Sequence, residues 1–234
     1  MFSNKCRGYC NGKKIRLELI NSMTPLITKN IKFKKNDIIF EQNSPRSSTY
    51  ILLKGKIKLS FLLPDGDQIN LGFYSAKNVI LTSTDNRHPF MSLFKVEAVE
   101  DCLIGVVPAS SIENNEYLYK IITRYYDIIF KKVYLQMVEL MSRNKLDSLY
   151  CILIRLANTY GIEVSNGIKI NIKLSNIDLA GYIGTSKETI SRLMRKMKDL
   201  DLITTEDKYI ILKDIDYMKR KIEYTDDLEE LYII

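Results

Sequence analysis

The sequence has one histidine and four cysteines among its 234 residues. A single histidine cannot supply the several-histidine metal site that enzymes with double-stranded β folds use. The cysteines, at positions 6, 10, 102 and 151, are too few and too scattered for the disulfide framework of a secreted protein. The sequence also shows no Ser/His/Asp, Cys/His or glycine-rich phosphate-loop arrangement. These absences argue against an enzyme and indicate a reducing compartment.

Long hydrophobic runs are missing as well. No uninterrupted apolar stretch approaches the roughly 20 residues that span a bilayer. The basic segment 1–14 is followed by no apolar core of the signal-peptide type. We therefore expect a soluble, cytoplasmic protein with no membrane partner, and a chain of this length predicts two domains.

The charge of the chain is unbalanced. A formal net charge of +7 and an isoelectric point near 9.0 favour a polyanionic partner. Basic residues are dense in the first 35 positions, whereas the last segment, residues 223–234, is an acidic tail. Neither end of the chain has a pattern typical of a segment that recognises a specific nucleic-acid sequence.

Short apolar segments separated by turn residues fill positions 31–107. This pattern is typical of an antiparallel sheet protein, and Pro64-Asp65-Gly66-Asp67 is one of the turns that divide it. The best candidate strands are Tyr50–Leu53, Lys56–Leu63, Gln68–Tyr74, Phe94–Ala98 and Leu103–Val107. We expect residues 1–111 to form a β-roll of the cupin-like jelly-roll kind.

The pattern changes after Pro108, because residues 112–141 contain no glycine or proline and repeat apolar residues at steps of three and four. This predicts one long helix within a segment 112–143. Its apolar stripe is broader than packing on one small sheet domain requires. A second helix packed along it, as in a dimer, would cover the rest. The residues predicted for the dimer interface are Leu118, Ile121, Tyr125, Ile128 and Leu135. The alternative is that the helix packs between the two domains of its own chain.

Residues 144–222 read as a winged helix-turn-helix domain. A helix at 146–160 ends at Gly161, and residues 168–174 alternate like a strand. Ser175 can cap a first helix and Ser186 a second, with Gly184 giving the turn its conformational freedom. Two strands, 202–205 and 209–212, then form a hairpin that resembles a wing. The whole chain is thus predicted to be α+β.

The second helix, residues 186–199, turns its polar residues outward. In this geometry the start of the helix enters the major groove, where arginine donates to guanine and glutamate accepts from cytosine. Glu188 and Arg192 are therefore the base-reading candidates, although their i, i+4 spacing also suits an ordinary surface ion pair. The residues predicted to bind phosphates are Ser175, Ser186, Lys187, Thr189, Arg195, Lys196 and, in the wing, Lys208. The wing hairpin is equally consistent with a purely stabilising role.

Over nearly its whole length the chain resembles the CRP/FNR family of bacterial transcriptional regulators. The segment Thr185–Leu193 is similar to the family's recognition helix, and Glu188, Ser191 and Arg192 look like its FNR subtype. Lys54–Leu59 and the turn at 64–67 look like the first glycine turns of the family's roll. The resemblance implies a homodimer that binds a palindromic, TTGAT-like site in double-stranded DNA. It would recruit or obstruct RNA polymerase there, as activator or repressor.

The resemblance does not extend to the known sensory sites of the family. Residues 76–91 lack the Gly-Glu pair and the Arg-Ser-Ala run that hold a cyclic nucleotide, so cyclic AMP is not expected. Iron-sulfur members hold their cluster with three amino-terminal cysteines and one in the roll. This chain offers only Cys6, Cys10 and Cys102, so a conventional cluster is not expected. No cofactor is assigned. Three roles stay open for these thiols: a disulfide switch, a metal held partly by other ligands, or no role beyond packing.

One reading from a different class remains. The roll could bind a small ligand or metal as cupin-type enzymes do, while the winged helix makes protein contacts instead of binding DNA.

Overall fold

The computed structural model describes residues 12–46, 48–66, 68–76, 78–81, 90–113 and 115–224. The chain forms two compact units, Met1–Phe130 and Lys131–Ile234. The boundary between them falls within the long helix α3 (Glu116–Ser142). No helix in the described ranges is both long and apolar enough to cross a membrane.

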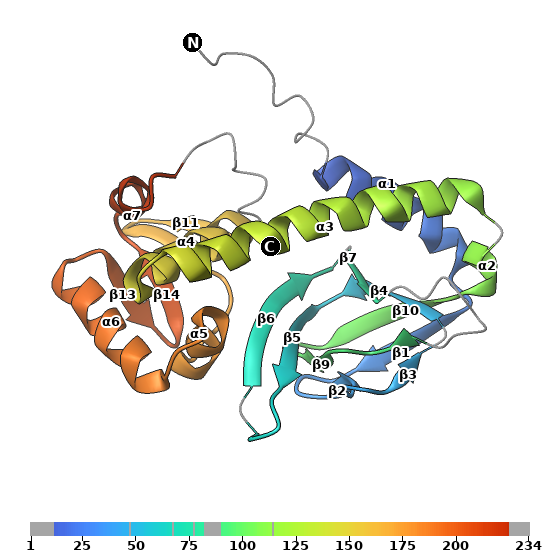
Figure 1. Ribbon diagram of the computed structural model, residues 1–234, viewed down its shortest axis with the longest axis horizontal. Coiled ribbons are helices and arrows are strands. Elements are labelled where there is room, and N and C mark those ends of the chain that lie inside the picture. The colour runs from blue at the N-terminus through green and yellow to red at the C-terminus, as the bar shows by residue number, and fades with distance from the viewer. Residues whose placement is uncertain are drawn as a thin grey trace, which may run out of the picture. The chain divides into compact units, whose positions relative to one another are not determined.

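The first unit is built on two four-stranded antiparallel sheets (Figure 1). The first sheet has the strand order β1 (Lys29–Phe33), β10 (Cys102–Pro108), β4 (Ser48–Lys54) and β7 (Asn78–Leu81). The second has the order β2 (Ile38–Phe40), β9 (Lys95–Ala98), β5 (Lys56–Leu62) and β6 (Gln68–Ser75), and β3 (Pro45–Arg46) pairs with β8 (Phe90–Met91). The predicted antiparallel roll and its five candidate strands are confirmed.

The alternation along β4 explains how the first sheet is covered on both faces. Successive side chains of a strand point to opposite faces, and Ile51 and Leu52 are both fully buried but belong to different cores. Leu52 packs between the two sheets with Ile57 of β5 and Val96 of β9. Ile51 packs on the other face, against helices. The tight turn from β4 to β5 requires Gly55, whose φ is +99° and where a Cβ would lie 2.6 Å from the carbonyl oxygen of Asp101.

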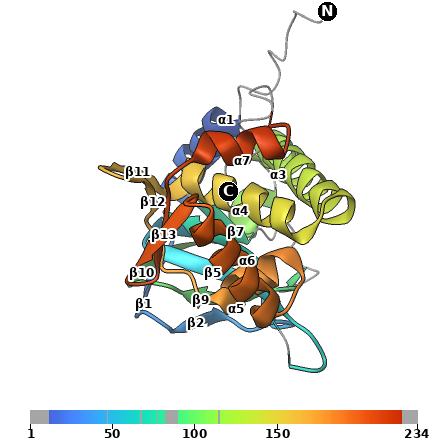
Figure 2. The same ribbon diagram turned by 90° about the vertical axis from the view of Figure 1, so that its left-hand side faces the viewer.

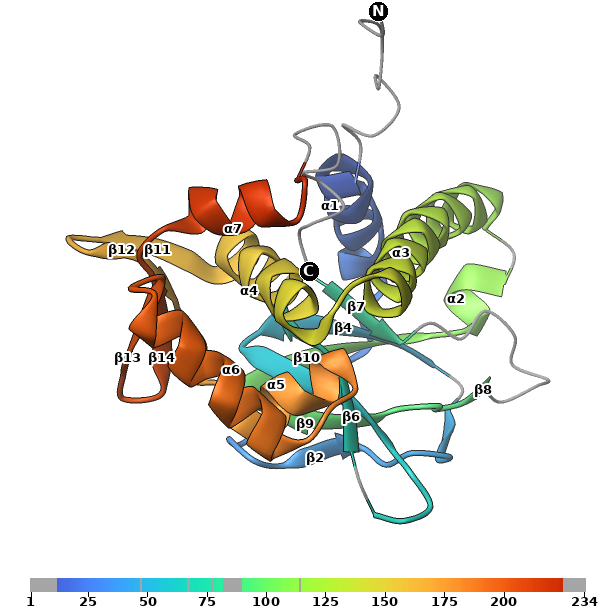
Figure 3. The same cartoon turned by 60° about the vertical axis from the view of Figure 1, so that its left-hand side comes forward.

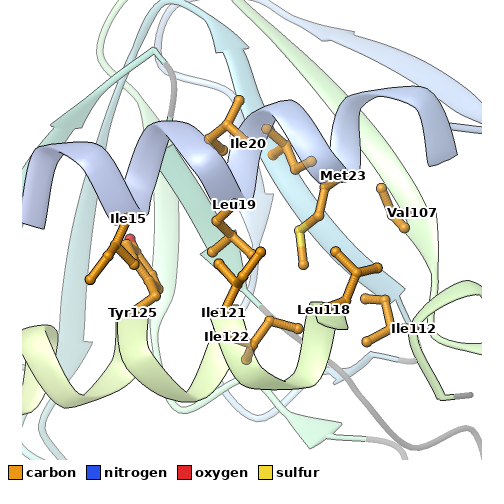
Figure 4. Packing of buried hydrophobic residues seen from close by; sticks show 11 residues of the cluster. Ile15, Leu19, Ile20, Met23, Val107, Ile112, Leu118, Ile121, Ile122 and Tyr125 are labelled. Carbon is orange, nitrogen blue, oxygen red and sulfur yellow. The ribbon is translucent and has the colours of Figure 1, made fainter. Parts of the chain in front are cut away.

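A helix that the sequence analysis did not foresee covers this outer face. α1 (Gly12–Met23) is followed by the 3₁₀ turn η1 (Thr24–Leu26), and α2 (Ser110–Glu113) precedes α3. Figure 4 shows Leu19 and Met23 of α1 directed toward Ile121 and Leu118 of α3. The long helix predicted for 112–141 is confirmed as α3, but it begins at Glu116 after the separate turn of α2.

This packing corrects the predicted dimer interface. Leu118, Ile121 and Tyr125 are at most 6% exposed and belong to the core that α1, α3 and the first sheet share, so their assignment to a dimer seam is wrong. Ile128 packs against the same cluster, and Leu135 is half-buried. The apolar stripe on this side of the helix is covered by the chain's own α1.

The second unit begins in the last part of α3 and contains the predicted helix-turn-helix (Figure 2). Its helices are α4 (Lys145–Tyr160), α5 (Asn176–Ile183), α6 (Lys187–Asp199) and α7 (Ile215–Lys221). Its four-stranded antiparallel sheet has the order β11 (Gly161–Val164), β12 (Gly167–Ile170), β14 (Tyr209–Leu212) and β13 (Ile203–Glu206). The strand expected at 168–174 ends at Ile170, and β11 and α7 are additions to the prediction.

A buried ion pair joins α3 to α4 within this unit. Arg155 Nη2 donates to Glu139 Oε2 over 2.8 Å, and the two side chains are only 3% and 5% exposed. Arg143, just past α3, donates to the carbonyl oxygen of Ile222 over 2.8 Å. Lys145 Nζ donates to the carbonyl oxygen of Ile183 at the end of α5, over 2.9 Å. Cationic side chains thus tie the start of this unit to α7 and to the helix-turn-helix.

Candidate nucleic-acid interface

The turn between α5 and α6 is defined by the predicted capping residues Ser175 and Ser186 and by Gly184. The Ser175 hydroxyl accepts from the Asp178 N–H while the Asp178 side chain accepts from the Ser175 N–H, which is a complete capping box. Gly184 has the left-handed conformation, with φ of 59°. Ser186 caps α6 by accepting from the Thr189 N–H over 3.2 Å. These caps fix where each helix begins.

One face of α6 is buried and the opposite face is open. Ile190, Met194 and Met197 are at most 7% exposed, and Leu193 is half-buried. The exposed residues of the helix include Lys187, Glu188, Ser191, Arg192, Arg195 and Lys196. Among the ion pairs found in the described residues, none joins Glu188 to Arg192, so both side chains face solvent.

The wing lies beside α6 and ends in a tight two-residue turn (Figure 3). Asp207 and Lys208 both have positive φ, 47° and 68°, as the favoured short hairpin turn requires. The carbonyl oxygen of Lys208 accepts from the Leu174 N–H over 3.1 Å, which ties the turn to the residue just before the helix-turn-helix. The Lys208 side chain itself is exposed.

A groove of about 580 Å³ runs between α6, the start of α5 and the wing turn. It brings together five of the predicted DNA-binding residues: Ser175, Lys187, Ser191, Arg195 and Lys208. The other five, Ser186, Glu188, Thr189, Arg192 and Lys196, are on or just before α6 but do not line the groove. Lys187, Ser191 and Arg195 of the first set are on α6 with the second set, whereas Ser175 precedes α5 and Lys208 is in the wing turn.

The structure adds residues that sequence reasoning missed. Asn176, at the start of α5, donates to Ser191 Oγ over 2.8 Å. Lys198 donates to Thr205 Oγ1 of β13 over 2.7 Å and so ties α6 to the wing. Lys169 and Lys173 lie over the ring of Tyr209, 4.2 Å and 5.2 Å from its centre. The sequence signal for the last two residues is the pair of lysines in segment 168–174, whose alternation predicts only a strand.

The structure describes two of the four cysteines, Cys102 and Cys151. Cys102 is buried, and its thiol lies 3.1 Å from the Glu100 carbonyl oxygen and 3.3 Å from that of Lys56. Burial raises the pKa of Cys102 to about 11, so its thiol stays protonated and unreactive near neutral pH. Of the three roles left open for this thiol, its burial and contacts favour packing. Cys6 and Cys10 lie outside the described residues.

Cys151 is 1% exposed, as expected for a core residue, and burial raises its pKa to about 12. No group of three or more metal-ligating His, Cys, Asp or Glu side chains occurs in the part of the chain that the structure describes. Residues 82–89, the middle of the region compared with the cyclic-nucleotide cassette, also lie outside it.

Two family models match the chain, one in each unit. The model of the cyclic nucleotide-binding domain matches residues 30–114, and the model of the Crp-like helix-turn-helix domain matches residues 149–221. Both matches follow the architecture described above.

Individual relatives extend over most of the chain. The "Anaerobic regulatory protein" of Bacillus subtilis is 28% identical over 199 residues, covering 82% of this chain and 83% of that protein. The "Listeriolysin regulatory protein" of Listeria monocytogenes is 25% identical over 212 residues, covering 87% of each. A solved CRP-family transcriptional regulator from Thermus thermophilus matches with a TM-score of 0.71 at 17% identity, over 82% of this chain and 96% of that one.

Proposed function

Because the chain belongs to the CRP/FNR family of transcriptional regulators, which are DNA-binding proteins and not enzymes, we propose that α6 reads base edges in the major groove. The observation that carries this is the open face of α6, where Glu188, Ser191 and Arg192 are exposed opposite the buried Ile190 and Met194. Arginine can donate two hydrogen bonds to guanine, and glutamate can accept from the amino group of cytosine. The preferred half-site is TTGAT-like.

The phosphate contacts follow from the groove beside α6. Lys187, Arg195 and Lys208 are three of the four cationic side chains that line it, with Lys198. Phosphates on either side of the major groove would contact them as α6 enters. Thr189 and Lys196 add a hydroxyl and an ammonium donor, whereas the hydroxyls of Ser175 and Ser186 donate to Asp178 Oδ2 and Thr189 Oγ1 and would have to turn to reach a phosphate. These contacts orient the protein without selecting a sequence.

Two copies of the chain bind one palindromic site. The proposed seam is the exposed apolar stripe in the last part of α3: Phe130, Val133, Tyr134, Met137, Val138 and Met141 are each more than half exposed. Their three- and four-residue spacing is that of a helix that packs along another helix. A homodimer would present two recognition helices about one turn of DNA apart. The bound site would lie near a promoter in the cytoplasm, where RNA polymerase is the further partner.

Selection of bound duplexes from a random pool tests the proposal. The full chain is expected to enrich inverted repeats with a TTGAT-like half-site. Arg192→Ala should weaken the selected site by about 1–3 kcal/mol and relax the preference at one position. Lys196→Ala is the matched control, because loss of a phosphate contact weakens all sequences alike and lowers the salt dependence. Equal loss on selected and random DNA for Arg192→Ala would contradict base reading.

The same experiment separates the remaining alternative. A winged helix used for protein contacts would retain no duplex above the level of competitor DNA, whatever the salt concentration. Repeating the selection under oxidising and reducing conditions also tests whether Cys6 and Cys10 give the protein a redox input.

A further inference from the structure

Ser191 and Asn176 form a hydrogen bond across the turn of the helix-turn-helix. Asn176 is the first residue of α5 and Ser191 lies in the first half of α6. The Asn176 side-chain amide donates to Ser191 Oγ over 2.8 Å, and both residues line the groove beside the wing. Ser191 is exposed on the face of α6 that carries Glu188 and Arg192.

The Ser191 hydroxyl is bonded differently from four other hydroxyls in the helices of this protein. The hydroxyls of Ser22, Thr123, Ser142 and Thr159 each donate to the carbonyl oxygen four residues earlier in their own helix. In the described part of the chain the Ser191 hydroxyl makes no such bond and only accepts, from Asn176. Its proton is therefore left for an acceptor outside the protein.

We propose that Asn176 is a positioning residue that sets the hydrogen-bonding polarity of Ser191 toward DNA. The inference rests on the proposed function, because it takes Ser191 to face a base. A serine hydroxyl has one proton and can either donate or accept at a base edge. An amide N–H can only donate, so Asn176 occupies a lone pair of Ser191 Oγ and directs the hydroxyl proton into the major groove.

This polarity predicts which bases Ser191 favours. A donating hydroxyl matches the O4 of thymine or the O6 and N7 of guanine, and it opposes the amino group of cytosine, which is itself a donor. Without Asn176 the hydroxyl can rotate and meet either kind of base. The specificity at this position would therefore depend on Asn176, a residue of α5 that itself touches no base.

Replacement of Asn176 by aspartate reverses the bond. A carboxylate only accepts, so Ser191 would donate to residue 176 and turn a lone pair toward the DNA. We would measure the affinity of the full chain, at low salt, for duplexes that carry each of the four bases at every half-site position. Ser191→Ala identifies the position that Ser191 reads, because the preference there should fall by roughly two- to tenfold, the range of one net hydrogen bond.

At that position Asn176→Ala should lower the preference by a similar factor, and Asn176→Asp should shift it toward cytosine. In the Ser191→Ala background neither change should alter the base order, since Asn176 acts through Ser191. Ile177→Asp is the matched control: Ile177 is the next residue of α5 and is 60% exposed. Its added charge should weaken all duplexes alike and leave the base order unchanged. Ratios between bases cancel any loss of folded protein.

Two results would overturn the inference, and they are distinguishable. If Ser191→Ala changes the preference but Asn176→Ala and Asn176→Asp both keep the wild-type order, Ser191 reads a base without help from Asn176. If Ser191→Ala changes the preference at no position, the base-reading role proposed for Ser191 fails as well, while Glu188 and Arg192 keep theirs. Should Asn176→Asp bind no duplex at low salt, Asn176→Ala decides the matter alone.

Discussion

Between Glu116 and Ile129 the helix α3 buries apolar side chains against its own chain, whereas between Phe130 and Ser142 the buried residue is Glu139. In the first part, α1 and the first sheet cover Leu118, Ile121 and Tyr125. In the second part the polarity is inverted, because Glu139 is 4% exposed while Met137 is 51% and Met141 76% exposed.

The difference shows that the two parts of one helix have different kinds of partner. An amphipathic helix buries its apolar face in the core of its own domain, and the first part of α3 does so. The second part meets α4 through an ion pair with Arg155 and leaves its apolar face uncovered. A stripe of large apolar side chains on a protein surface marks an interaction site. This is why we place the centre of the dimer seam in the second part.

The largest expected effect is on the buried ion pair. Arg155→Ala leaves the Glu139 carboxylate buried without its ion-pair partner, which should lower the free energy of unfolding by about 3–5 kcal/mol. Urea unfolding followed by circular dichroism measures this loss. The matched control is Lys120→Ala, which removes an exposed ion pair to Glu116 of the same helix and should cost at most about 1 kcal/mol. Equal losses for the two variants would remove the contrast between a buried and an exposed pair.

The first part of α3 should respond as a core does. Leu118→Ala should lower the free energy of unfolding by about 2–5 kcal/mol, because it removes buried methyl groups and leaves a cavity beside α1. Val133→Ala, in the exposed stripe, should change the stability of the isolated protomer by about 0.5 kcal/mol or less. Urea unfolding of both variants, at a protein concentration where dimers are dissociated, measures the two changes in the free energy of unfolding. A larger loss for Val133→Ala than for Leu118→Ala would mean that the Val133 face of α3, and not the Leu118 face, packs in the protomer core.

The error about Leu118 shows what periodicity can and cannot reveal. The steps of three and four residues correctly predicted the helix, because they depend only on its local geometry. They identify an apolar face without identifying what covers it. The face that contains Leu118 is covered by α1. The apolar residues Leu19 and Met23 of α1 lie in the densely basic start of the chain, where charge conceals the apolar pattern. The helix-turn-helix was more predictable because Ser175 and Ser186 cap their helices through contacts three residues away.

The parts of the site that the sequence could not predict are contacts across elements. The bond from Asn176 to Ser191 spans 15 positions, and the pair from Glu139 to Arg155 spans 16. Neither spacing has a local signature, because each depends on how two helices cross. The same holds for the groove, which needs the wing turn to return beside α5.

The smallest expected effect concerns the uncovered part of α3. Met137→Lys places a charge in the middle of the apolar stripe, and desolvating it at a helix-helix seam should weaken dimerisation by about 2 kcal/mol, the range of a central interface residue. Sedimentation equilibrium of the full chain measures the dissociation constant, expected to rise roughly 30-fold. Gln136→Lys adds the same charge on a neighbouring face of the helix and should leave dimerisation unchanged. If Met137→Lys dimerises like the wild type, the dimer seam does not include the second part of α3 and the comparison between its two parts fails.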